Sequence, residues 1–408
     1  MPTFPALPTD FYSITDYGAV SGEDCTAALT ACFKAAKSAG RASYIPPGTW
    51  YHSDTLTLNG QRLFGAGRAS ILAASNPDRS ALYLTGNGPQ VQNLQISCGA
   101  TRRNNDGAAT GIFIDRATSF LVENIIVARS SGAGIMNWGG GNGTIRCCYV
   151  DHSWADAIHN TFGAHDIVIE YNKTFNSGDD GIAVVSYSDS GMCRAIRAHH
   201  NTIVENLWGR GMSIVGGEGI VFEYNHIEKT AGDIAGIYVA SEKVYETEGV
   251  DGAEVRYNTV WGCGGPKTGH GAIHVFSDTG SAVENISLHH NQTIDPNGAH
   301  YVANGAGLVT GAIANAQMYS DRSHVQFGNS VGSGLSFSGT RQSVSALPGE
   351  TAPYEAGPGF IDDAYAVAAP EPEPEPVPPE PATLDTVMAA LTEIRDTLVR
   401  IEGKIDGA

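Results

Sequence analysis

The 408-residue chain lacks several features that would assign it to a common class of protein. Its 24 Lys and Arg residues are outnumbered by 43 Asp and Glu residues, so we expect no basic surface for nucleic acid or anionic membranes. The seven cysteines are odd in number and have no CxxC spacing, so they indicate neither a disulfide framework nor a zinc site. No run of about 18 apolar residues could span a bilayer, and the first residues have no secretory leader pattern. These absences predict a soluble, unsecreted protein without a bound metal, a nucleic-acid partner or a membrane insertion.

An internal repeat is the strongest signal that is present. A small residue followed by an alternating apolar run recurs at Gly111, Gly134, Ala157, Gly181, Gly211, Gly236 and Ala272. The steps between these positions are 23, 23, 24, 30, 25 and 36 residues. Short strands that recur at about 23 residues predict three-strand coils, which stack to bury their apolar faces. We therefore predict an all-β protein, a right-handed parallel β-helix, with loops inserted at the two longest steps.

A second repeat runs in phase with the first. Asparagines recur, each directly after a Tyr or a His, at Asn172, Asn201, Asn225, Asn258 and Asn291. The histidine pairs 199–200 and 289–290 directly precede two of these asparagines, so we expect them to belong to the stack of coils rather than to a metal site.

A capping helix is expected at the N-terminal end, because an open end of a β-helix exposes unpaired backbone and apolar side chains. Residues 24–40 have helical periodicity, with Gly40 as the stop signal. The apolar face of this helix consists of Ala28, Leu29, Cys32, Phe33 and Ala36, and Cys25 and Cys32 are expected to be core residues. We thus predict a cap with the first coils (1–67), a β-helix core (68–297) and an irregular C-terminal end of the β-helix (298–369).

The C-terminal tail has a different composition. Residues 370–382 are rich in Pro and Glu and predict an extended, stiff linker. In the segment 383–408, Leu384, Leu391, Leu398 and Ile405 recur every seven residues, with Val387, Ile394 and Ile401 between them. This heptad pattern predicts a coiled-coil helix, and Leu at one seam position with Ile at the other favours three or four strands. A single amphipathic helix that docks onto a partner is the alternative.

The N-terminal region also carries a family resemblance. The stretches "ITDYGAV", "AALTACFKAAKSAG", "YIPPGTWY" and "LFGAG", between residues 14 and 67, resemble the cap of pectate-lyase-like β-helix proteins. That superfamily includes polygalacturonases and many bacteriophage tailspikes, and the resemblance extends over residues 14–297. It implies the fold, whereas fold alone does not determine the substrate.

Polygalacturonases carry their chemistry on consecutive coils as Asn-x-Asp, Asp-Asp, Gly-His-Gly and Arg-Ile-Lys. When the residues that precede each small residue are aligned, Asp156 falls at the aspartate of the first motif, and Asp179 with Asp180 falls at the pair. The sequence departs from the family pattern elsewhere, because Trp154 replaces the asparagine and Arg210 replaces the histidine.

Two further departures concern the last motifs of the family. The coil where Arg-Ile-Lys should occur has Ile237, Tyr238 and Val239, without either cation. A Gly-His-Gly does occur around His270, but it lies three coils beyond the aspartate pair. At a strand spacing of about 4.8 Å this is roughly 14 Å along the axis, so we expect His270 to lie outside the site.

The resemblance implies that Asp156, Asp179 and Asp180 are catalytic. Hydrolysis of a glycosidic bond needs one protonated carboxyl group and one carboxylate, and three neighbouring carboxyls should raise one another's pKa values. We expect four further residues to bind substrate: Arg210, Trp154, Trp208 and His159. The alternative without a function is that two aspartates beside a glycine are ordinary turn residues and that Arg210 forms a surface salt bridge.

Two other functions compete with a glycoside hydrolase. In the pectate lyases, which share the fold, aspartates hold calcium and an arginine is the base, so this chain could be a calcium-dependent polysaccharide lyase with Arg210 as base. Otherwise no cofactor is expected. A non-catalytic spike that only adheres to polysaccharide is the second alternative.

The combination of a β-helix and a trimerising tail resembles a bacteriophage tailspike or another virion spike. It implies a homotrimer that is assembled in the bacterial cytoplasm and attached to a virion through the C-terminal helix. The expected partner is a bacterial capsule, exopolysaccharide or lipopolysaccharide, which the spike would bind and depolymerise.

Overall fold

The computed structural model describes residues 4, 6–104, 109–321, 324–328, 334–347 and 357–362. These residues all belong to Met1–Tyr365, which forms one compact unit of the chain. The predicted Pro/Glu linker (370–382) and the predicted coiled-coil helix (383–408) lie outside the described residues.

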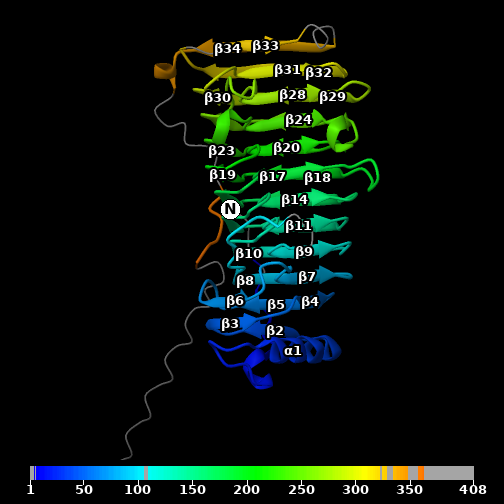
Figure 1. The fold of residues 1–408 in the computed structure, drawn as a ribbon, viewed down its shortest axis with the longest axis vertical. Helices are drawn as coiled ribbons and strands as arrows, with labels where there is room; N and C mark the ends of the chain where they lie inside the picture. Colours follow the sequence, from blue (N-terminus) through cyan, green and yellow to red (C-terminus); the bar gives the residue numbers. More distant parts are fainter. Residues whose placement is uncertain are drawn as a thin grey trace, which may run out of the picture. The chain divides into compact units, whose positions relative to one another are not determined.

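The described unit is a stack of parallel coils, each made of three strands (Figure 1). One coil contains β12 (Gly141–Arg146), β13 (Tyr149–Asp151) and β14 (Ile158–Thr161), and its strands pair in parallel with β15, β16 and β17 of the next coil. This arrangement confirms the predicted parallel β-helix with three-strand coils.

One side of the stack is an 11-stranded parallel sheet, whose described strands are β4 (Leu56–Asn59), β7 (Leu82–Thr85), β9 (Ile112–Asp115), β11 (Ile135–Trp138), β14, β17 (Ile182–Val185), β20 (Met212–Val215), β24 (Ile237–Ser241), β28 (Ile273–Ser277), β31 (Tyr301–Gly305) and β33 (Val325–Phe327). The residues that follow the repeated small residues are in register across this sheet, as Ile135, Ile158 and Ile182 illustrate. The predicted repeat therefore corresponds to the strands of this sheet. Alternate residues point inward, so Ile, Leu and Val fill the core.

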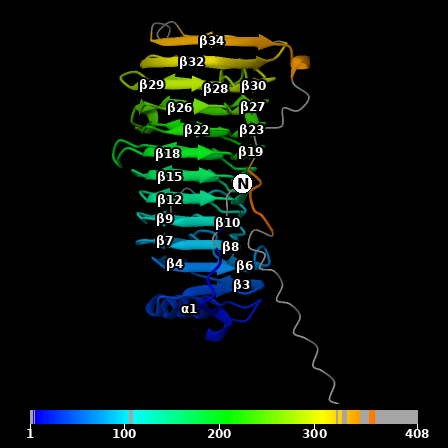
Figure 2. The same ribbon diagram turned by 180° about the vertical axis from the view of Figure 1, so that it is seen from behind.

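The other strands form a larger sheet with two rows (Figure 2). The first row contains β1 (Phe11–Ser13), β2 (Ala42–Ile45), β5 (Arg62–Gly65), β8 (Gln90–Ser97), β10 (Leu121–Ala128), β12, β15 (His165–Glu170), β18 (Arg194–His199), β21 (Gly217–Glu218), β22 (Val221–Glu223), β25 (Val250–Asp251), β26 (Glu254–Arg256), β29 (Ala282–His289), β32 (Leu308–Tyr319) and β34 (Leu335–Gln342). The second row contains β3 (Gly48–His52), β6 (Ser70–Ala74), β13, β16 (Lys173–Phe175), β19 (Thr202–Val204), β23 (His226–Glu228), β27 (Thr259–Trp261) and β30 (Gln292–Ile294). The described residues also form four short 3-10 helices, η1 (Ile14–Tyr17), η2 (Ala231–Asp233), η3 (Lys243–Tyr245) and η4 (Val344–Ala346).

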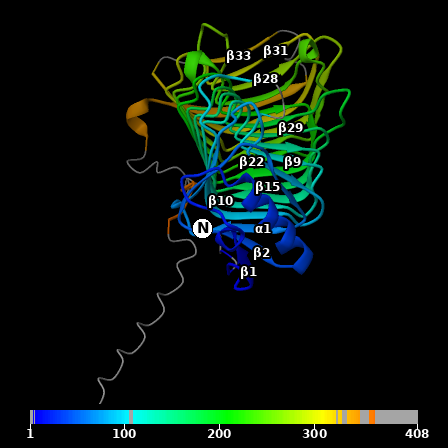
Figure 3. The same ribbon diagram turned by 60° about the horizontal axis from the view of Figure 1, so that its bottom comes forward.

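The helix α1 (Thr26–Ala39) lies at the N-terminal end of the stack, beside β1 and β2 (Figure 3). Its predicted stop is observed, because Gly40 adopts a left-handed conformation and its N–H bonds to helix carbonyls. Leu29, Cys32 and Phe33 are buried, as the predicted apolar face requires. Among the residues that the structure describes, no helix has the length and apolar character needed to cross a bilayer.

The predicted asparagines form a buried ladder along one corner of the coils, which we call the asparagine ladder. The side-chain N–H of Asn172 donates to Oδ1 of Asn201 at 3.0 Å, and Asn201 donates in the same way to Asn225. The same Oδ1 atoms also accept from backbone N–H groups of the preceding coil. The ladder thus satisfies backbone groups that the turn would otherwise leave unpaired in the interior.

Part of the stretch 298–369, which we expected to be the irregular end of the β-helix, forms further coil strands in the residues that the structure describes. β32 pairs with β29 and β34 pairs with β32, both in parallel. The register shifts within both pairs, and β34 is mostly exposed, which explains why the sequence periodicity is weak there.

A row of acidic and basic residues crosses the outer face of the larger sheet, and we call it the charge ladder. Its members are paired in register from one coil to the next: Glu123, Arg146, Glu170, His199, Glu223, Arg256 and His289. Glu223 is buried and accepts from Nε of Arg197 at 2.5 Å and from Nε of Arg256 at 2.6 Å. Although burial raises the pKa of Glu223, the two arginines hold it below its ordinary value.

Residues 357–362 cross several coils at one corner, and we call this segment the strap (orange in Figure 1). The N–H of Gly359 donates to the carbonyl of Tyr171 at 3.3 Å. Ile361 exchanges two hydrogen bonds with the side chain of Asn124, at 2.8 and 3.0 Å, and Asp362 pairs with Arg68. The strap therefore joins three coils that are not neighbours.

Candidate active site

A cleft of about 340 Å³ lies on the outer face of the 11-stranded sheet, over β14, β17 and β20. Its floor is formed by the outward-facing side chains of Ala183, Val185 and Val215. Its functional side chains are Asp156, His159, Asp179, Asp180, Trp208 and Arg210, together with Arg103, Tyr187, Glu242 and Tyr245. The cleft thus brings together all but one of the candidate residues that the sequence suggested.

The three aspartates converge because of the coil register. Ala157 N–H donates to the carbonyl of Asp180 at 2.9 Å, which places Asp156 and Asp180 on neighbouring coils directly before β14 and β17. Gly209 on the next coil approaches Asp179 closely, since a Cβ at Gly209 would lie 2.4 Å from the Asp179 carbonyl carbon. Its φ of +76° also favours glycine, so this position is limited to glycine on two grounds.

Asp156 and Asp180 are held by hydrogen bonds from the protein. Oδ1 of Asp156 accepts from the backbone N–H of Asp180 at 2.8 Å, and Oδ2 of Asp156 contacts Nδ1 of His159 at 2.7 Å. Oδ1 of Asp180 accepts from the backbone N–H of Arg210 at 2.5 Å, and Oδ2 accepts from the Ser213 hydroxyl. Both carboxyl groups therefore have fixed orientations.

Asp179 is the most accessible of the three carboxyls, with 26 % of its side chain exposed. Its Oδ2 accepts from Nη1 of Arg103 at 2.9 Å. Burial and the charge of Asp156 raise the pKa of Asp179, and Arg103 opposes this increase.

Asp180 is almost fully buried, with 4 % of its surface exposed. Burial raises the pKa of Asp180 to about 7, and the charges of Asp156 and Asp179 add to the effect. The guanidinium of Arg210 and the hydroxyl of Ser213 act in the opposite direction. Because the pKa values of the neighbours Asp179 and Asp180 are both raised, this pair retains a proton close to neutral pH.

Arg210 is fixed beside this cluster by other groups. Its Nη2 donates to Oε1 of Glu242 at 2.7 Å, and its guanidinium carbon lies 4.4 Å from the ring centroid of Tyr238. Burial lowers the pKa of Arg210, but Asp180 and Glu242 outweigh burial and raise it above its ordinary value. Arg210 is therefore a permanent cation, which makes it unsuited to the role of a base.

The cluster also has the spacing of a cation site. One carboxylate oxygen from each of Asp156, Asp179 and Asp180 can be chosen so that the three lie within 4.8 Å of one another. However, both oxygens of Asp156 and of Asp180 already accept hydrogen bonds, and Asp179 pairs with Arg103. A bound calcium ion would have to share or displace these partners, so the geometry favours a shared proton.

The remaining candidates have different environments. His159 is buried, and although burial lowers its pKa, the charge of Asp156 raises it above the ordinary value. Trp208 is 58 % exposed and lines the cleft, so its ring is available to a ligand. Trp154 is not among the lining residues in the described part of the chain, and its indole N–H donates to the carbonyl of Ala100 at 3.3 Å. His270 likewise lies outside the lining.

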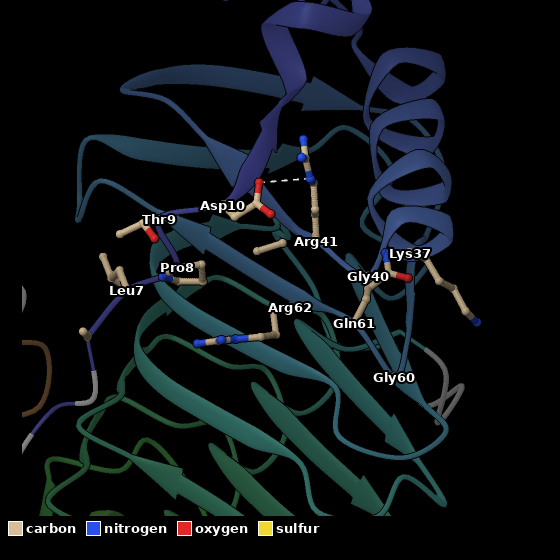
Figure 4. Close-up of a pocket in the computed structure, with 12 residues that line it drawn as sticks. Leu7, Pro8, Thr9, Asp10, Lys37, Gly40, Arg41, Gly60, Gln61 and Arg62 are labelled. Atoms are coloured by element: carbon tan, nitrogen blue, oxygen red, sulfur yellow. Dashed lines mark ion pairs between the residues drawn. The ribbon is translucent and has the colours of Figure 1, made fainter.

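A larger cavity, of about 590 Å³, lies at the N-terminal end of the unit between residues 6–10, α1 and β5 (Figure 4). Arg41 pairs there with Asp10 at 2.9 Å, and Lys37 and Arg62 also line it. Asp10 is the only carboxyl group among the lining residues that the structure describes. Because the cavity has no second carboxyl to complete an acid and base pair, we place the candidate active site in the cleft.

Several residues of the cleft were not predicted from the sequence. Ser213 follows Gly211 by two positions, so the repeat could have found it as an outward-facing neighbour of the aspartates. Tyr187, Glu242 and Tyr245 lie in the loops inserted at the steps of 30 and 36 residues. Arg103 lies in a long loop before β9, which would have appeared as another long step if the repeat had been traced back to Ala81.

Comparison with known proteins supports the fold. The profile of a family described as "Right handed beta helix region" matches residues 80–249. The catalytic unit of a thermostable GH87 α-1,3-glucanase from Streptomyces thermodiastaticus strain HF3-3 is 19 % identical, with a TM-score of 0.61 over 84 % of this chain and 72 % of that chain. A GH87 α-1,3-glucanase catalytic domain in complex with tetrasaccharides is 18 % identical, with a TM-score of 0.67 over 83 % and 70 %.

At this level of identity the similar structures establish the fold and nothing finer. The predicted right-handed parallel β-helix is confirmed by the family match and by these neighbours. A search among curated proteins found no match.

Proposed function

We propose that this protein is a glycoside hydrolase that binds a bacterial surface polysaccharide and cleaves its glycosidic bonds. The observation that carries the proposal is the cluster of Asp156, Asp179 and Asp180 in an open cleft, where burial and mutual repulsion retain a proton near neutral pH. A protonated carboxyl beside an ionised carboxylate is the pair of groups that glycoside hydrolysis requires.

The GH87 glucanase structures support this proposal through their own aspartates. Three structures of α-1,3-glucanase catalytic domains, in complex with nigerose or tetrasaccharides, each carry alanine at one of three aspartate positions. Two of those positions are adjacent, and the third lies 23 residues before the first of the pair. Asp156, Asp179 and Asp180 have the same spacing in this chain.

The roles follow from accessibility and hydrogen bonding. Asp179 is the most exposed carboxyl and shares the proton of the cluster, so it would protonate the glycosidic oxygen of the leaving group. Asp156 and Asp180 are oriented by N–H and O–H donors, and they would orient and deprotonate the attacking water. The raised pKa of Asp180 suits a group that accepts that proton near neutral pH. Arg210 and Trp208 would contact the sugar beside the bond that breaks.

The lyase alternative is less consistent with the contacts of Arg210. An arginine that acts as base must lose its proton, whereas ion pairing with Glu242 and the charge of Asp180 raise its pKa. We therefore rank the calcium-dependent lyase below the hydrolase and retain the non-catalytic spike as the alternative if no cleavage occurs.

We also propose that the protein is a virion spike. Its support is the heptad pattern of 383–408, which fits a trimeric coiled coil. Analytical ultracentrifugation should give three times the chain mass, and replacement of Leu391 and Leu398 by Glu should give the monomer mass. A monomeric parent chain would contradict the trimer.

The enzymatic proposal is tested on purified capsule, exopolysaccharide and lipopolysaccharide glycans incubated with the protein. We expect new reducing ends, a decrease in polymer size and no absorbance near 235 nm, because hydrolysis leaves no unsaturated sugar. Asp179→Asn should remove the activity, whereas the matched control Asp151→Asn, on β13 and outside the cleft, should retain it. Absorbance near 235 nm would instead indicate a lyase, and a polymer that is bound but uncut would indicate an adhesive spike.

A further inference from the structure

A second, smaller cavity lies beside the cleft, on the same outer face of the 11-stranded sheet. Its volume is about 190 Å³, roughly that of six water molecules. Its lining consists of Trp138, Phe162, Tyr187, Asp189, Ser190, Tyr245 and Glu246. Trp138 is on β11 and Phe162 follows β14, so this cavity lies on the N-terminal side of the aspartates along the stack (Figure 1).

The two cavities adjoin each other, and we refer to them together as the depression. Tyr187 and Tyr245 line both of them, and each belongs to one of the loops that the repeat identified as insertions. The loops are also joined to each other, because Tyr187 and Thr247 form an antiparallel bridge and Ser188 N–H donates to the carbonyl of Glu246 at 2.9 Å. The wall that borders both cavities is therefore built from two loops that brace one another.

The depression runs obliquely across the sheet. The aspartates precede β14 and β17, at the start of these strands, whereas Trp138 ends β11 and Phe162 follows the end of β14. A glycan that leaves the aspartates toward the second cavity therefore crosses from the starts of the strands to their ends, toward the N-terminal coils.

The lining of the second cavity combines two chemical types. The Trp138 and Phe162 rings stack with their centroids 4.4 Å apart and form an apolar wall, and the Tyr245 ring is 62 % exposed. Asp189, Ser190 and Glu246 also line the cavity and can supply acceptors for hydroxyl groups. Apolar rings with a few convergent acceptors suit a pyranose, whose C–H face is apolar and whose rim carries hydroxyls.

We propose that the cavity between Trp138, Phe162, Tyr187 and Tyr245 is a sugar-binding subsite, which holds an uncharged pyranose unit of the same glycan whose bond lies at the aspartates. This inference rests on the proposed function for the identity of the ligand. Asp189 and Glu246 favour an uncharged sugar as the ligand, because their carboxylates repel a uronate and accept hydrogen bonds from neutral hydroxyl groups.

The test uses Asp180→Asn as the background, so that binding is measured without turnover. An array of bacterial capsular, exopolysaccharide and lipopolysaccharide glycans, with neutral glucan oligosaccharides of two to six units, is probed first. We expect binding to members with neutral sugars and an affinity that rises with oligosaccharide length. No binding to any member by the folded protein, or binding only to members made of uronates, would overturn the proposal.

Two substitutions then locate the subsite. Tyr245→Ala should weaken binding about tenfold, whereas Trp261→Ala, which removes a Trp that is 43 % exposed on β27 of the other sheet, should leave it unchanged. A ligand-induced change in tryptophan fluorescence should be smaller in Trp138→Phe, which keeps an apolar ring and leaves only the response of Trp208 in the cleft, and it should be unchanged in Trp261→Phe. Equal affinity of Tyr245→Ala and the parent, or an unchanged fluorescence response of Trp138→Phe, would contradict the proposal.

The subsite and the proposed hydrolase can fail separately. If the parent protein, in which Asp180 is intact, binds the glycan through Tyr245 and Trp138 but never cleaves it, the subsite is supported and the proposed hydrolase activity is wrong. If Tyr245→Ala in that protein cleaves polymer with the parental KM, the hydrolase stands and the subsite is wrong.

Discussion

Two carboxylate-rich regions of this β-helix are organised in opposite ways. In the charge ladder, acidic and basic residues alternate along the larger sheet, and the arginines beside Glu223 lower its pKa. In the cleft, three carboxyls gather within one site, and burial raises the pKa of Asp180 to about 7. The same coil geometry thus produces a stabilising arrangement on one sheet and a destabilising one on the other.

The difference indicates where the fold has been adapted to chemistry. Stacked coils place side chains from neighbouring coils about 4.8 Å apart, so a column of residues is stable when neighbours are complementary and unstable when they carry like charges. A cluster of like charges in a buried position lowers stability, and such clusters are typical of active sites. The contrast therefore makes opposite predictions for the two regions.

The largest expected effect is on catalysis. Asp180→Asn should lower the rate of polymer cleavage about a thousandfold, because an amide can neither accept the proton of the attacking water nor carry the negative charge of the cluster. Initial rates of reducing-end formation measure this, and circular dichroism checks that the variant is folded. A variant that cleaves at the parental rate would remove Asp180 from the mechanism.

The same substitution should have the opposite effect on stability, and the effect should depend on pH. Because folding raises the pKa of Asp180 from 3.8 to about 7, its contribution to stability is present below about pH 4 and is lost as the pH rises through 7. We expect the free energy of unfolding of Asp180→Asn, relative to the parent, to increase from pH 4 to pH 8. Urea unfolding at both pH values measures it, and a constant difference would contradict the raised pKa.

Glu223→Gln, in the charge ladder, should lower the stability of the protein and leave its activity unchanged. It leaves Arg197 and Arg256 without a carboxylate, so we expect a loss of about 2 kcal/mol in the free energy of unfolding at pH 7. Because the pKa of Glu223 is lowered by folding, the loss should shrink as the pH falls through the pKa of the folded state. Activity per folded molecule should not change, and a variant with normal stability but reduced activity would reverse the assignment of the two regions.

The smallest expected effect concerns Arg103. Arg103→Met removes the cation beside Asp179, so the pKa of Asp179 should rise by about one unit. The alkaline limb of the profile of kcat/KM against pH should shift to higher pH by the same amount, because the acid then stays protonated to higher pH. Arg102→Met, which removes a neighbouring arginine that pairs with Asp78 instead, is the matched control and should leave the limb in place.

Much of the fold could be predicted because the sequence repeat follows from the need of each coil to bury its apolar face against the next. The coil strands follow Gly111, Gly134, Ala157 and Gly181 at regular steps, and the asparagine ladder follows from the need to pair turn backbone. The coils beyond residue 297 could not be delimited, since exposure and register shifts weaken their periodicity.

Only those site residues that occupy the same position in successive repeats could be predicted. Asp156, Asp179 and Asp180 lie directly before strands, so their alignment in sequence became proximity in space. Arg103 and Tyr245 lie in loops, whose paths depend on contacts that no periodicity encodes. Trp154 does not line the cleft, and its indole N–H donates to a backbone carbonyl in the loop before β9.

The strap has a consequence for how the β-helix would respond to mechanical load. In a plain solenoid each coil contacts only its neighbours, so tension on the chain peels coils away one at a time from the end. Here a pull on the chain beyond Asp362 first meets Arg68, and then the contacts with Asn124 and Tyr171 on other coils. Tension on that part of the chain is therefore applied to coils within the stack, rather than to the last coil at its C-terminal end.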